Sequence, residues 1–149
     1  MKQLLAACLL VFPLCGFAEE PDPNVVMANR VLQAAGFPTL PDKAREMQCY
    51  AWSGLSAGIY ATWLMDGADF DAHVGKFGGM EMQTPIPASL LAPPNAAAPW
   101  FAPGGLKGGQ VWFLGRIARA APELFRLYAS REEGRLCLFY TWNNKSMYP

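Results

Sequence analysis

The feature that most constrains this chain is an uncharged segment from Gln48 to Met65, which lies in the stretch MQCYAWSGLSAGIYATWLM. Read at helical spacing, its bulky residues fall on one face and its small residues on another, so both faces favour burial. The bulky residues are Trp52, Leu55, Ile59 and Trp63, and the small ones are Ala51, Gly54, Ala57, Gly58 and Ala61. We therefore predict a central core helix that starts at Pro41-Asp42, contains residues 47–65 and stops at Asp66-Gly67.

A membrane-spanning helix is the competing interpretation of this segment. Gly54 and Gly58 have the GxxxG spacing that lets helices approach closely in lipid. However, the uncharged run is short for a bilayer, it is diluted by Ser, Thr and Gly, and Cys137 offers Cys49 a partner outside the membrane. We therefore expect no stable membrane insertion.

The N-terminus has the pattern of a secretory signal peptide. Residues 1–18 read MKQLLAACLLVFPLCGFA, with one Lys, an apolar run, and small residues Gly16 and Ala18 where a signal peptidase cleaves. We therefore predict a signal peptide over residues 1–18, a single globular domain over residues 19–149, and export to the periplasm.

Two cysteines, Cys49 and Cys137, remain in the chain after the predicted signal peptide. An even number of cysteines in an oxidising compartment predicts one disulfide, and two buried thiols are the alternative. On the entropic model this bond would constrain the unfolded chain by roughly 4 to 5 kcal/mol.

The rest of the chain predicts an α+β fold. Spacings of three and four predict a helix over residues 25–35 between Asn24 and Gly36, and Asp69 can cap a short helix over residues 70–77. A loop with six prolines and four glycines spans residues 83–109. The segments GQVWFLGRIA, ELFRLYAS and RLCLFYTW then predict a three-stranded antiparallel meander against which the N-terminal helices pack. The alternative is an all-α fold, with helices from Val111 and through Leu127.

Alternation along these strands predicts where a partner binds. If Cys137 turns inward to meet Cys49, the other face of the meander carries aromatic residues and arginines, which is typical of interface centres. The predicted partner-binding residues on this face are Trp112, Arg116, Arg126, Tyr128, Tyr140 and Trp142. Alternatively the proline-rich loop covers the face through Leu90, Trp100 and Phe101, and Trp100 and Phe101 then become the binding residues.

Charge and chemistry favour a binding protein over an enzyme. The formal net charge is zero, but residues 104–149 hold seven bases and three acids. A basic half in an exported chain suits a protein partner better than a nucleic acid. The single histidine, His73, lies near Asp69 and Asp71, a pattern more typical of a helix start than of a metal or catalytic site. We therefore expect no cofactor, no metal and no catalytic residue.

In its plan of elements the chain resembles the small periplasmic immunity proteins that bacteria make against their own secreted cell-envelope toxins, such as type VI secretion effectors. The resemblance is one of layout, and no motif carries it. It implies that the protein neutralises a secreted toxin by occluding the active site of that toxin. An envelope assembly factor or chaperone for a secretion or pilus component is the alternative, and a small hydrolase or metal-binding protein is a third.

Overall fold

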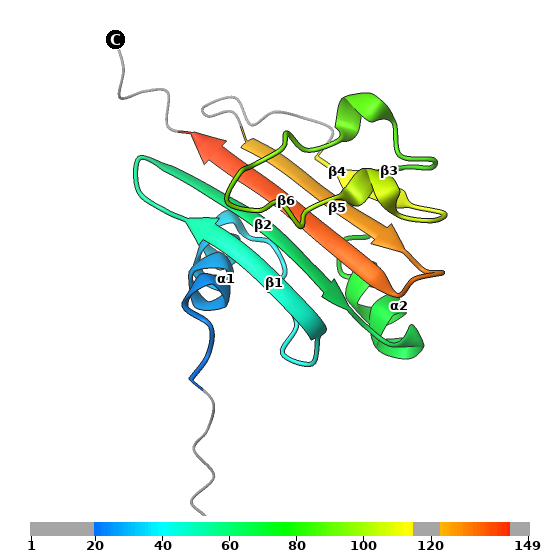
Figure 1. The fold of residues 1–149 in the computed structure, drawn as a ribbon, viewed down its shortest axis with the longest axis horizontal. Coiled ribbons are helices and arrows are strands. Elements are labelled where there is room, and N and C mark those ends of the chain that lie inside the picture. The colour runs from blue at the N-terminus through cyan, green and yellow to red at the C-terminus, as the bar shows by residue number, and fades with distance from the viewer. Residues whose placement is uncertain (1–19, 115–122, 144–149) are drawn as a thin grey trace, which may run out of the picture.

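The protein is built on one antiparallel sheet of six strands, with two helices on one face and the proline-rich loop across the other (Figure 1). This is a computed structural model, and it describes residues 20–114 and 123–143. The spatial order of the strands is β1-β2-β6-β5-β4-β3. The strands are β1 Arg45–Trp52, β2 Ser56–Leu64, β3 Glu81–Gln83, β4 Gln110–Phe113, β5 Glu123–Ser130 and β6 Arg135–Asn143. The helices are α1 Pro23–Ala35 and α2 Gly67–Gly75, and the loop contains the short 3-10 turns Ala88–Leu90 and Pro103–Gly105.

The predicted central helix is wrong, because residues 45–64 form the β1–β2 hairpin. Aromatic and β-branched residues favour strands here, and Gly54 has a φ of +146° in the turn. Gly58 lies opposite Trp52 on the neighbouring strand, and a Cβ at position 58 would lie 2.1 Å from the indole of Trp52, so only glycine fits there. The small residues therefore do not line a helix face. The all-α alternative is wrong as well, because Val111 and Leu127 lie in strands β4 and β5.

The three strands of the predicted meander are present, but they form only half of the sheet. Strands β4, β5 and β6 are sequential antiparallel neighbours, as the sequence predicts. The sheet continues on one side because β2 pairs along the whole of β6, and on the other side because β3 pairs with β4. The prediction of helices packed on a three-stranded meander is therefore replaced by a six-stranded sheet with two helices.

The two observed helices lie close to two of the predicted ones. The first, α1, begins after Asp22, whose side chain accepts a hydrogen bond from the backbone N–H of Asn24, so Asp22 rather than Asn24 is the N-cap. It ends at Gly36, which has the left-handed φ of 77°. The second, α2, begins after Asp66, three residues before the predicted cap. None of the helices within the described residues is long and apolar enough to cross a membrane.

The side chains of the sheet form two separate clusters. The helix face, which packs against α1 and α2, carries a cluster that includes Ile59, Trp63, Trp112, Phe125, Leu127, Leu138 and Tyr140. The loop face carries Tyr60, Val111, Tyr128, Cys137 and Phe139, against which Leu90, Trp100 and Phe101 of the proline-rich loop pack. Both faces of the central strands are therefore covered, as Figure 1 shows.

The predicted disulfide is also wrong, because the sheet separates the two thiols. Cys49 pairs with Ala61 of β2, whereas Cys137 pairs with Thr62 of β2, so β2 lies between them. Strands two positions apart lie roughly 9–10 Å from each other, beyond the reach of a disulfide. Cys49 also belongs to the helix face and Cys137 to the loop face. Both are free thiols, and burial raises the pKa of Cys49 to about 12 and that of Cys137 to about 11.

Candidate functional site

The predicted partner-binding residues do not share one face. Trp112, Tyr140 and Trp142 lie on the helix face, whereas Tyr128 lies on the loop face. Arg126 pairs with Phe139 across the strands and so shares the loop face. Arg116 lies outside the described residues. The prediction that these side chains lie side by side is wrong because of the register of β5: Tyr128 pairs with Cys137, and Trp112 pairs with Leu127, so Tyr128 and Trp112 point to opposite faces.

The proline-rich loop covers Tyr128, which is the alternative that the sequence left open. The Tyr128 hydroxyl donates a hydrogen bond of 2.6 Å to the carbonyl of Leu90, and the Tyr128 side chain is fully buried. The ring of Phe101 packs edge-on against Tyr60 and Tyr128, with centroid distances of 5.1 and 6.2 Å. Trp100 packs edge-on against Phe101 and is partly exposed. These contacts hold the loop on the sheet.

His73 is buried in the core and does not form a site with its neighbouring aspartates. Its ring packs edge-on against Trp63 and Phe77, each at a centroid distance of 5.7 Å. Asp71 is instead engaged by Arg131 through two hydrogen bonds of 2.7 and 2.8 Å. Burial, helped by the charge of Lys76, lowers the pKa of His73 to about 4, so the ring is neutral at pH 7. Within the described residues no group of three His, Cys, Asp or Glu side chains is placed to hold a metal ion.

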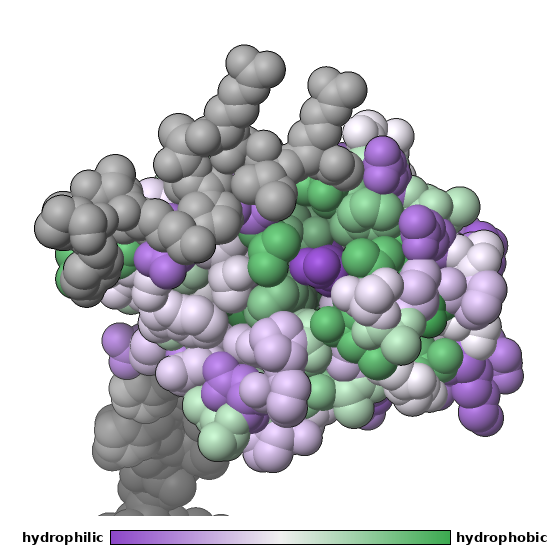
Figure 2. Space-filling model, turned by 90° about the horizontal axis from the view of Figure 1, so that it is seen from above, coloured by the Kyte–Doolittle hydropathy of each residue, from purple (hydrophilic) through white to green (hydrophobic). Residues whose placement is uncertain are grey.

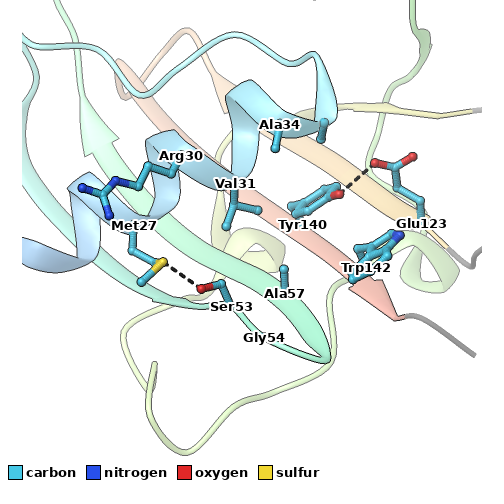
Figure 3. Close-up of a pocket in the computed structure, with 11 residues that line it drawn as sticks. Met27, Arg30, Val31, Ala34, Ser53, Gly54, Ala57, Glu123, Tyr140 and Trp142 are labelled. Carbon is cyan, nitrogen blue, oxygen red and sulfur yellow. Dashed lines mark hydrogen bonds between the residues drawn. The ribbon is translucent and has the colours of Figure 1, made fainter. Parts of the chain in front are cut away.

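A groove of about 720 Å³ lies on the helix face, between α1 and the end of the sheet (Figure 3). We call it the α1 groove. It is lined by Met27, Arg30, Val31, Ala34 and Ala35 of α1, Ser53, Gly54 and Ala57 of the hairpin, and Glu123, Tyr140 and Trp142 of β5 and β6. Its volume lies within the range of about 300–1,000 Å³ that is common for binding sites.

Pairing across three strands builds the floor of the groove. Ala57 of β2 pairs with Trp142 of β6, and Trp142 pairs with Glu123 of β5, so these three side chains form one row. Tyr140 lies on the same face, two residues before Trp142. The α1 wall follows from helical spacing, because Met27, Val31 and Ala34 recur at intervals of four and three residues.

The polar groups of the groove lie at its two ends. At the sheet end, the Tyr140 hydroxyl donates a hydrogen bond of 2.8 Å to Oε1 of Glu123. Burial and the neighbouring Glu123 carboxylate raise the pKa of Tyr140, so the phenol keeps its proton and donates it. At the other end lie the exposed Arg30 and the pair of Ser53 and Met27, whose Oγ and Sδ atoms are 3.1 Å apart (Figure 3).

The sequence pointed to Tyr140 and Trp142 but missed Glu123 and the residues of α1. Met27, Arg30 and Ala34 recur at spacings of three and four along the helix, and this spacing is a usable signal for the α1 wall, where Met27 is partly buried and Arg30 and Ala34 are exposed. The contribution of Glu123 has no such signal, because it depends on the cross-strand register with Trp142.

Comparisons of this chain with models of known protein families, with curated proteins and with solved structures found no match.

Proposed function

We propose that this chain is an exported, periplasmic binding protein that holds a segment of a protein partner in the α1 groove. The observation that carries the proposal is the groove itself, a cavity of about 720 Å³ with mostly aliphatic walls, a half-buried tryptophan and a charged group at each end. Aromatic and arginine side chains around a desolvated apolar centre are the usual composition of interface hot spots.

A neighbouring feature favours a protein segment over a small ligand. Leu55 lies at the tip of the β1–β2 hairpin, between Gly54 and Ala57, which line the groove, and its side chain is 60% exposed. An exposed leucine at the rim extends the apolar surface beyond the cavity, so a larger partner can cover both. Figure 2, which views the molecule from above, shows hydrophobic residues near the middle of the visible surface, with one strongly hydrophilic residue among them and others toward the edge.

We propose, more specifically, that the protein neutralises a secreted cell-envelope toxin. The observed layout differs from the one that suggested immunity proteins, so this role stays a prediction, as does the alternative of an envelope assembly factor or chaperone. Both roles require a stoichiometric protein partner. The identity of the partner decides between them, because a toxin supports the first role and a secretion or pilus component supports the second.

A pull-down from envelope extract with matched variants tests the proposal. Ala34 is an exposed position of α1 that lines the groove, and Gln33 is the adjacent exposed position that does not line it. Ala34→Trp should block the groove, so this variant should not pull down the partner, whereas Gln33→Trp should still pull it down. The melting temperatures of both variants should be close to that of the wild type. If the folded Ala34→Trp variant still pulled down the partner, the groove would not be the binding site.

A further inference from the structure

We infer that the sheet end of the α1 groove receives a lysine or arginine side chain of the bound partner segment, with Glu123 as its counter-ion and Trp142 as its aromatic contact. This inference rests on the proposed function and specifies the chemistry of its ligand. The charge and the geometry of the sheet end carry it.

The carboxylate of Glu123 is held in position but is not neutralised by the described residues. Tyr140 is 3% exposed and donates to Oε1 of Glu123, which fixes the direction of the carboxylate. Within residues 20–114 and 123–143 no other hydrogen bond and no ion pair reaches this carboxylate. None of these described residues therefore has to be displaced when the second oxygen, Oε2, accepts a donor from the partner. A carboxylate that is oriented before binding loses less conformational entropy when it accepts a charged donor.

Trp142 places an aromatic ring beside this acceptor. Trp142 and Glu123 are directly paired across β6 and β5, which brings their side chains close on the helix face. A cation between a carboxylate and an indole gains both a charge-assisted hydrogen bond and a cation–π contact. The aliphatic stem of a lysine or arginine can then lie against Val31 and Ala57, which line the adjacent part of the groove.

The other charge of the groove does not compete for Glu123. Figure 3 shows Arg30 at the opposite end from Glu123, with its side chain directed away from it. Arg30 is exposed, whereas Glu123 is partly buried, so the field of Glu123 is less screened by solvent. The sheet end of the groove therefore favours a positive group.

A displayed library of random heptapeptides tests the inference on the purified protein. The selections use the wild type, Glu123→Gln, and Glu132→Gln as a matched control. Glu132 is an exposed acid in the turn between β5 and β6, at the other end of β5 from Glu123, so the control makes the same chemical change away from the groove. Ala34→Trp is the fourth bait and reports whether the selected peptides use the groove at all.

We expect wild-type and Glu132→Gln selections to share a lysine or arginine at one position beside apolar residues, and Glu123→Gln selections to lose that position. For a selected peptide, replacing the basic residue by norleucine should weaken binding about tenfold in calorimetry for the wild type and much less for Glu123→Gln. Peptides that are blocked by Ala34→Trp but show no basic preference would overturn this inference and leave the proposed function standing. Peptides unaffected by Ala34→Trp, or no selected peptides, would count against the proposed function itself.

Discussion

Gly134 offers the sharpest test of how the end of β2 meets the turn between β5 and β6. It has a left-handed φ of 62°, and its carbonyl accepts a hydrogen bond of 2.9 Å from the backbone N–H of Met65. A Cβ added at this position would lie 2.7 Å from the carbonyl oxygen of Met65. Because that oxygen belongs to the backbone, it cannot rotate away as a side chain can.

The cost of Gly134→Ala has two parts. A left-handed alanine costs about 1–2 kcal/mol, and displacement of the hydrogen bond between Met65 and Gly134 costs about 1 kcal/mol more. We therefore expect the free energy of unfolding to fall by about 2–3 kcal/mol. For a domain of this size that corresponds to a drop in melting temperature of roughly 6–10 °C.

Gly108→Ala is the matched control, and urea unfolding is the assay. Gly108 also has a left-handed φ, of 55°, but an added Cβ meets no atom within 4 Å. Its substitution should show only the cost of the left-handed backbone. Equal losses for Gly134→Ala and Gly108→Ala would refute the contact with Met65 and, with it, the placement of the β2 end beside this turn.

Three further outcomes are expected. Burial lowers the pKa of His73 from 6.5 to about 4, so below pH 6.5 the unfolded chain binds a proton that the folded chain does not bind. The free energy of unfolding should therefore fall as the pH drops from about 6.5 toward 4, by at most roughly 3 kcal/mol. Urea unfolding at pH 7 and pH 5 should show a smaller decrease for His73→Phe than for the wild type, and equal decreases would contradict this. Cys49 and Cys137 should both label with a thiol reagent in denaturant without reductant, and a bridged pair would contradict the strand order. Tyr128→Phe removes the hydrogen bond to Leu90, so the free energy of unfolding should fall by about 1 kcal/mol and proteolysis within residues 84–109 should become faster. An unchanged rate of cleavage would show that this bond does not anchor the loop.

Local patterns predicted the elements whose residue composition or spacing favours one type of secondary structure. The α1 helix has apolar residues at spacings of three and four and a glycine at its end, and β5 and β6 are rich in aromatic and branched residues. Strand β4 was predicted on the same grounds. These elements are specified by residues close to one another in the chain.

The hairpin was missed because both faces of the sheet are covered. Strands β1 and β2 carry apolar side chains toward the helices and toward the loop, so their sequence shows no alternation of apolar and polar residues. The spacing of Trp52, Ile59 and Trp63 then matches a helix by chance. In the sheet, Ile59 and Trp63 lie on the helix face and Trp52 packs with the loop-face cluster.

The binding face was missed because alternation along each strand does not determine the register between neighbouring strands. The structure pairs Tyr128 with Cys137, so the side chains of β5 lie one residue out of step with the predicted faces, and a one-residue slip in register sends a strand's side chains to the other face. Trp112, predicted to be an exposed binding residue, is only 9% exposed within the helix-face core. The α1 groove itself depends on contacts between α1, β2, β5 and β6, which are distant in the sequence.

The most direct test of the binding site is amide hydrogen exchange of the protein alone and bound to the partner recovered in the pull-down. The α1 groove predicts slower exchange in three separated segments, namely residues 27–35, 53–57 and 140–143, with little change across residues 84–109. Slower exchange confined to residues 84–109, around Trp100 and Phe101, would contradict the groove and assign binding to the proline-rich loop.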